Sequence, residues 1–284
     1  MGERSKIEWT DATWNPVTGC TKVSPGCKHC YAERMALRLK AMGQPRYANG
    51  FQVTTHAAAL TVPLRWKKPR RIFVNSMSDL FHQDVPDEFI DDVFDVMASC
   101  WQHTFQLLTK RPERMADYFG AIRARLPVPG MGVCTGGPPF CGCVPGSGRI
   151  HEADVGYCGT PWPLPNVILG VSVEDQQRAD ERLVYLCELG EVGWRTMVSA
   201  EPLLRSVVLP ERYLALGKRA WVIVGAESGP KRRPTDINHI RSLRDQCVAA
   251  GIPFLLKQMD VGGKIVKLPT LDGRAWDELP EVLR

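Results

Sequence analysis

The feature that most limits the possible folds is a regular alternation that starts at residue 72. Short apolar segments of strand length are followed by longer amphipathic segments of helical length. The apolar segments are rich in β-branched and aromatic residues, and they are 72–76, 105–109, 167–173, 195–199, 220–224 and 253–257. Residues 86–100, between the first two, repeat apolar side chains with the period of a helix. This alternation predicts βαβ units and a parallel sheet.

Together with a short first strand near residues 14–17, the pattern gives about seven repeats, which suits a barrel rather than a sandwich. We therefore expect an α/β fold, a complete or partial parallel (β/α) barrel of about six to seven repeats. The chain has 284 residues, and we expect residues 1–284 to form a single barrel domain. Right-handed crossovers place the carboxyl end of every strand on one rim, where parallel barrels carry their active sites.

Serines and acidic residues follow the predicted strands, at the ends that would meet on this rim. They are Ser76, Ser78, Asp79, Ser172, Glu174, Ser199, Glu201 and Glu227. Charges packed into a crowded rim need partners or a ligand, so we expect these residues to bind a cofactor or substrate. The alternative is that polar residues simply begin each exposed loop. The sequence does not identify a catalytic residue.

Three cysteines lie on a loop before the first predicted helix, in a C-x6-C-x2-C array formed by Cys20, Cys27 and Cys30. Thiolates prefer soft metal centres, and three ligands are one fewer than a closed tetrahedral site needs. The array is open to three interpretations: a zinc site with its fourth ligand elsewhere, structural thiols or a disulfide, and a [4Fe–4S] cluster whose fourth iron has no protein ligand. His29 is a poor fourth zinc ligand because its neighbour Cys30 already occupies that side of the tetrahedron.

Three closely spaced cysteines on a loop after a first strand, with Tyr31 beside the last, resemble the radical SAM superfamily. The spacing differs from the superfamily's commonest C-x3-C-x2-C. The resemblance implies that Cys20, Cys27 and Cys30 hold a [4Fe–4S] cluster whose fourth iron is chelated by S-adenosylmethionine. It places Ser76, Ser78 and Asp79 at the methionine-binding segment and Ser172 and Glu174 at the ribose contacts. It also implies a reductant such as flavodoxin or ferredoxin.

Segments 7–20, 171–174 and 225–229 are similar, more closely, to a phage-associated three-cysteine-motif family of unknown function, and the similarity spans nearly the whole chain. We expect a radical SAM enzyme that cleaves S-adenosylmethionine to a 5′-deoxyadenosyl radical and acts on DNA or RNA, in DNA photoproduct repair or base modification. Basic segments at 65–71, 110–114 and 231–233, the first containing Trp66, favour a nucleic-acid partner. The alternatives are a non-catalytic, zinc-stabilised nucleic-acid-binding protein and a radical SAM enzyme acting on a peptide or small metabolite.

A Cys/Gly/Pro-rich stretch at residues 125–165 interrupts the repeats. Four cysteines occur in it, namely Cys134, Cys141, Cys143 and Cys158. The stretch has too few apolar residues to fold around a core of its own. We therefore expect an insertion held together by a second metal site, zinc or iron–sulfur. The alternative is an insertion with incidental thiols.

The remaining composition favours a cytoplasmic protein without a membrane anchor. The first eight residues are charged and lack the apolar core of a secretory signal. No apolar run approaches the roughly 20 residues that a membrane helix needs. Ten cysteines without an export signal indicate reduced thiols and metal ligation, and the net charge of +5 permits a polyanionic partner without requiring one.

Overall fold

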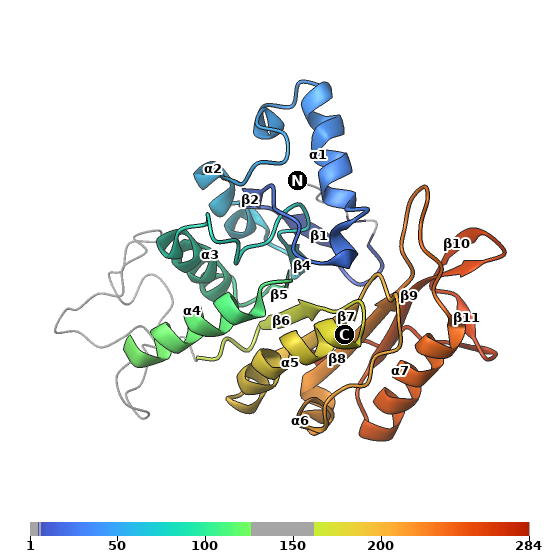
Figure 1. Ribbon diagram of the computed structural model, residues 1–284. Coiled ribbons are helices and arrows are strands. Elements are labelled where there is room, and N and C mark those ends of the chain that lie inside the picture. The colour runs from blue at the N-terminus through green and yellow to red at the C-terminus, as the bar shows by residue number, and fades with distance from the viewer. Residues whose placement is uncertain (1–4, 6, 126–161, 284) are drawn as a thin grey trace.

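The computed structural model describes residues 5, 7–125 and 162–283 (Figure 1). Its main sheet has eight strands, which are, in spatial order, β1 (Ala12–Trp14), β4 (Arg71–Val74), β5 (Thr104–Thr109), β6 (Val167–Ser172), β7 (Arg195–Ala200), β8 (Ala220–Gly225), β9 (Phe254–Val261) and β10 (Lys264–Lys267). All pairs from β1 to β9 are parallel, and β10 alone runs antiparallel, against β9.

Helices connect the successive strands of this sheet. They are α1 (Tyr31–Ala41), α2 (Ala57–Leu60), α3 (Asp87–Ser99), α4 (Pro112–Arg125), α5 (Gln176–Glu191), α6 (Glu211–Leu214) and α7 (Ile237–Ala250). Two small antiparallel sheets pair β2 (Val17–Thr18) with β3 (Thr54–Thr55) and β11 (Thr270–Leu271) with β12 (Arg274–Ala275). Figure 1 shows α1 at the opposite end of the molecule from α6.

The predicted parallel sheet built from strand–helix repeats is confirmed, but the barrel is partial. The strands join the sheet in chain order, as βαβ crossovers require. Among the described residues, β1 and β10 form the two open edges and do not pair with each other. The sheet is therefore a curled half-barrel. The predicted insertion at 125–165 lies almost wholly outside the described residues, as do Cys134, Cys141, Cys143 and Cys158.

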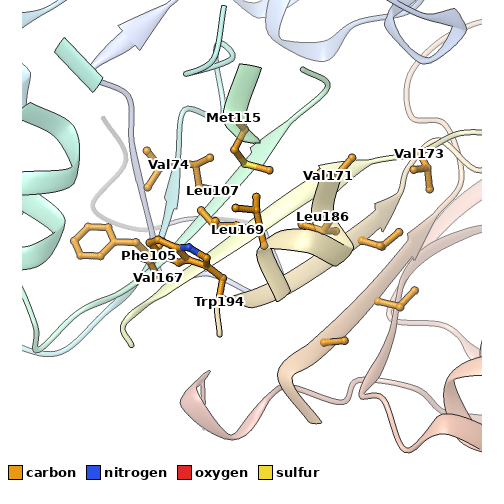
Figure 2. Close-up of a cluster of buried hydrophobic side chains, with 14 of the residues drawn as sticks. Val74, Phe105, Leu107, Met115, Val167, Leu169, Val171, Val173, Leu186 and Trp194 are labelled. Carbon is orange, nitrogen blue, oxygen red and sulfur yellow. The ribbon is translucent and has the colours of Figure 1, made fainter. Parts of the chain in front are cut away.

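Helices α3, α4, α5 and α7 bury their apolar stripes against the convex face of the sheet. On α3 the buried residues have the helical spacing that the sequence predicts, and they are Ile90, Val93, Phe94 and Met97. Figure 2 shows part of the cluster that they join, including Phe105 and Val167 of the neighbouring strands β5 and β6 and Trp194 just before β7. Burial of this continuous apolar layer provides the main driving force for the fold.

The concave face has its own, smaller apolar cluster. Ile168, Met197 and Trp221 extend from the strands, and Trp9 and Leu283 pack against them. Trp9 meets Trp221 edge-on, with 6.0 Å between ring centroids. Two segments far apart in the sequence thus fill the inside of the half-barrel. Of the helices in the described residues, none is long and apolar enough to cross a membrane.

Gly170, in the middle of β6, tests how tightly the concave face is packed. An added Cβ would lie 2.6 Å from Met197 and 2.8 Å from the backbone oxygen of Leu107. We expect Gly170→Ala to lower the free energy of unfolding by about 1–3 kcal/mol, because the backbone oxygen cannot move without disturbing the sheet. Urea unfolding measures the change.

The matched control for this substitution is Gly120→Ala, on an exposed turn of α4 where nothing lies within 4 Å of the added Cβ. It should raise stability by about 0.5–1 kcal/mol, since Ala is the better helix former. Equal effects of the two substitutions would contradict the packing described for β6.

Candidate functional site

The three predicted ligands lie on one loop, residues 19–30, which we call the cysteine loop. It begins at Gly19, where φ is +86° and a Cβ would lie 2.1 Å from the backbone oxygen of Gln52, so only glycine fits. The Gly19 N–H donates to Met77 O at 3.0 Å, and Cys30 is the N-cap residue of α1. Between these points the loop runs along the carboxyl edge, the edge of the sheet at which the parallel strands end.

Cys20, Cys27 and Cys30 are free thiols, and all three are half-buried. No three His, Cys, Asp or Glu side chains of the described residues are grouped so that they could hold a metal ion. Burial, and next the charge of Asp79, raises the pKa of the Cys20 thiol, while Arg111 acts in the opposite direction. A metal would therefore have to displace a proton from Cys20 on binding.

The first contact between the loop and the sheet edge is made by Arg111, which forms an ion pair with Asp79 at 3.1 Å. Asp79, 5% exposed, also accepts a hydrogen bond from the Thr109 hydroxyl at 2.7 Å. Arg111 donates from one nitrogen to Cys20 Sγ at 3.4 Å and from another to the backbone oxygen of Thr21 at 3.1 Å. The ends of β4 and β5 are thereby joined to the first cysteine.

A buried histidine supports this contact. The backbone N–H of Asp84 donates to His82 Nδ1 at 3.1 Å, so the ring proton is on Nε2, which lies 2.8 Å from Thr21 Oγ1 and donates to it. Burial, and next the charge of Arg111, lowers the pKa of His82, consistent with a neutral ring. The neutral tautomer fixes Thr21 as an acceptor for both His82 and Arg111.

The second contact comes from Glu174, which follows β6 and is fully buried. Its Oε1 accepts the backbone N–H of Gly26 at 3.0 Å, and its Oε2 pairs with Arg182 of α5 at 3.1 Å. A Cβ on Gly26 would lie 3.0 Å from the carboxylate, so glycine permits this close approach. Arg178, nearer to Glu174 in the sequence, pairs with Glu181 instead.

The third contact comes from Glu227, which follows β8 and is 5% exposed. Arg233 donates to it from its side chain and, at 2.8 Å, from its backbone N–H. His29 Nδ1 lies 4.0 Å from Glu227 Oε2. Burial acts to raise the pKa of Glu227, but the hydrogen bonds and charge of Arg233 outweigh it and hold that pKa below its usual value.

The three contacts follow one pattern. Each carboxylate is buried and paired with one arginine. The pair of Asp79 reaches the loop through Arg111, which bonds to Cys20, whereas Glu174 accepts the Gly26 N–H before Cys27 and Glu227 lies 4.0 Å from His29 before Cys30. Three of the eight rim residues expected to bind a cofactor, Asp79, Glu174 and Glu227, are thus gathered around the cysteine loop.

Two of the remaining rim residues fasten the end of β4 to the segment after β1. The Ser76 hydroxyl donates to Asn15 Oδ1 at 3.2 Å, and the Ser78 hydroxyl donates to Val17 O at 2.9 Å. Both serines are half-buried, so they lie at the edge without being sealed from solvent.

The last three rim residues lie where the concave face reaches the carboxyl edge. Ser172 and Ser199 are register partners on neighbouring strands, on the same face as Ile168 and Met197. Glu201 pairs with Lys257 at 2.5 Å, across the end of β8. Gly225 lacks the side chain that would block this pair, since its Cβ would lie 3.2 Å from the Glu201 carboxyl carbon.

An open cavity of about 510 Å³ adjoins the first cysteine. Its lining residues are Cys20, Thr21, Glu33, Phe51, Gln52, Val53 and Asp84. The Cys20 end of the loop is therefore accessible from the side of β2 and β3.

A family model described as "Protein of unknown function (DUF5131)" matches residues 4–280. The chain belongs to this family. No curated protein and no solved structure matches the chain.

Arg182 and Trp66 have surroundings that the sequence did not predict. Arg182 was missed, although it lies beside Leu183 on the apolar face of α5, where a charge needs a buried partner. Trp66, which gave the segment 65–71 its basic and aromatic character, is 7% exposed and belongs to the convex core. Arg70 lies over it, 4.9 Å from the ring centroid, so this ring is not presented for stacking.

The Glu174–Arg182 pair should contribute strongly to the stability of the fold. Glu174→Gln keeps the size of the side chain and an acceptor for Gly26, but it leaves Arg182 buried without a counter-charge. We expect the free energy of unfolding to fall by about 3–5 kcal/mol, measured by urea denaturation.

Glu181→Gln is the control, because it removes one charge from the more exposed pair with Arg178 and should change stability little. The Cys27 thiol should also react faster with a thiol reagent in the Glu174 variant. A Glu174 variant as stable as the Glu181 variant would rule out the role assigned to this pair.

Proposed function

We propose that this chain is a radical SAM enzyme acting on nucleic acid, in DNA photoproduct repair or base modification. In this proposal Cys20, Cys27 and Cys30 hold a [4Fe–4S] cluster, and its fourth iron binds S-adenosylmethionine. The supporting observation is that three free thiols share one loop at the carboxyl edge of a parallel sheet, each beside a buried carboxylate–arginine pair. Parallel α/β folds bind ligands at this edge.

Three free thiols on one loop match in type and number the protein ligands of an open [4Fe–4S] cluster, which supports the proposal. Ligands of one zinc ion must converge on a point, with sulfurs about 3.8 Å apart in a tetrahedron with Zn–S bonds of about 2.3 Å. Cluster ligands bind different iron atoms and need not converge. Arg111 at Cys20 and the Ser24 hydroxyl, 3.8 Å from Cys27 Sγ, are hydrogen-bonding groups of the kind that tune cluster potentials.

When bound, the cluster would deliver one electron, taken from a reductant such as flavodoxin or ferredoxin, to cleave S-adenosylmethionine to methionine and a 5′-deoxyadenosyl radical. The chain's own residues hold the thiols in place, because the carboxylate–arginine pairs connect the loop to the ends of β4, β5, β6 and β8. Each pair is neutral overall, so it fixes the loop without adding net negative charge beside three thiolates.

We assign Glu201 to the cofactor because it is the most exposed of the four rim acids. Its side chain is 22% exposed, against 7% for Asp79, 5% for Glu227 and 0% for Glu174. A carboxylate that solvent reaches can exchange its lysine partner for an ammonium or a ribose hydroxyl at lower cost than a buried one. Ser172 and Ser199 beside it offer hydroxyls on the same face. We also propose a second metal site, zinc or iron–sulfur, in the insertion at residues 125–165.

Replacing Cys20, Cys27 and Cys30 together with Ala tests the cluster. In protein purified and reconstituted without oxygen, we expect the variant to lose about four iron atoms per chain and all cleavage of S-adenosylmethionine. Iron and sulfide analysis and detection of 5′-deoxyadenosine are the measurements.

Cys100→Ala is the control, since it removes a buried core thiol and should leave the iron content unchanged. Full iron content in the triple variant, or zinc as the sole metal of the unaltered chain, would contradict the proposal.

A further inference from the structure

The positive charge of the chain is concentrated next to the cysteine loop. Residues 20–47 carry six lysines and arginines and one glutamate, a net charge of +5, which equals that of the whole chain. Lys22 pairs with the single acid, Glu33, at 2.9 Å. The arginines and lysine of α1, Arg34, Arg38 and Lys40, are exposed and take part in no ion pair within the described residues.

A second element adds to this surface from the other side of the carboxyl edge. Arg34 lies against the loop after β8, since a Cβ on Gly229 would be 2.3 Å from its Nη1. Lys231, two residues further along, is exposed and has no ion pair among the described residues. Its neighbours are occupied, because Arg232 pairs with Asp260 and Arg233 with Glu227. Arg34, Arg38 and Lys231 therefore form one exposed basic surface at the Cys30 end of the loop.

The acids nearby do not cancel this charge. Glu227 and Glu174 are buried and already paired. Asp84, the exposed acid that lines the cavity with Cys20, lies at the opposite end of the loop. Basic residues in loops usually carry solvated charge that balances nearby acids. Here the nearby acids Glu227 and Glu174 already pair with other arginines, so they do not balance Arg34, Arg38 and Lys231.

We infer that the backbone of a nucleic acid binds along Arg34, Arg38 and Lys231 and so brings a nucleotide to the cysteine loop. The reaction of the bound nucleotide rests on the proposed function, whereas the binding itself does not. Arg34 and Arg38 are four residues apart and so share one face of α1. Unpaired cations on one surface attract phosphates, and each phosphate contact releases counterions, which makes the affinity depend on salt.

The test is anaerobic binding of a fluorescent 20-nucleotide single-stranded DNA and of its duplex, from 50 to 200 mM salt. The variant Arg34→Gln/Arg38→Gln/Lys231→Gln should reduce the slope of log affinity against log salt by about 2–3. Over this fourfold range of salt its affinity should then fall about 16- to 64-fold less than that of the unaltered chain.

The matched control is Lys67→Gln/Lys68→Gln/Lys218→Gln. It removes three charges at the amino edge, where the strands begin; all three lysines are exposed and unpaired among the described residues. Trp101, 80% exposed, lies near the same edge and makes it the strongest rival surface. The control should keep the slope of the unaltered chain. A reduced slope in the control alone, or in neither variant, would overturn the inference.

The two proposals can fail separately. A chain that contains iron and cleaves S-adenosylmethionine but does not bind DNA would overturn the inference and leave the radical chemistry intact. A chain without iron that binds DNA through Arg34, Arg38 and Lys231 would support the inference and refute the cluster.

Discussion

Buried carboxylates paired with arginines connect the cysteine loop to the sheet, and the rest of the site depends on them. The loop has little apolar surface of its own, since Val23 is 44% exposed, so hydrophobic burial cannot fix it. Asp79, Glu174 and Glu227, each paired with one arginine, do this instead. Arg111 bonds to Cys20, Glu174 accepts the Gly26 N–H, and Glu227 lies 4.0 Å from His29. A buried charge is tolerated only when its partner is in place. The folded loop and the paired carboxylates therefore depend on each other: the loop helps to enclose the carboxylates, and the carboxylate–arginine pairs hold the loop in place.

The fold could be predicted from the sequence where the pattern is local. Apolar runs followed by amphipathic segments predicted the seven parallel strands and the βαβ connections that put them in chain order. Closure of the barrel could not be predicted, because it depends on whether β1 meets the last strand. The antiparallel β10 is mostly exposed, and its short segment has no strong apolar alternation. Trp9 and Leu283 fill the concave face from opposite ends of the sequence.

The sequence indicated which types of residue form the site, but not which arginine pairs with which acid. Strand ends pointed to the acids, but the arginines that hold them come from two loops and one helix, at separations from 6 residues for Glu227–Arg233 to 32 for Asp79–Arg111. Arg182 carried a usable signal, a charge on an apolar helix face. Trp66 carried a misleading one, because a tryptophan among basic residues can equally be a core side chain whose flanking cations cover it.

Holding the loop with neutral pairs also explains how one edge of the sheet can be rich in acids and yet carry a positive surface. Had Asp79, Glu174 and Glu227 been unpaired, their charges would oppose both thiolates and phosphates. Pairing each with an arginine removes that repulsion locally and leaves the cations of α1 uncompensated. Because Cys30 is the N-cap residue of α1, the residue that ends the cysteine loop also positions the start of the helix that carries Arg34 and Arg38. Metal ligation and polyanion binding would then depend on the same few contacts, so a change at Glu227 should disturb both.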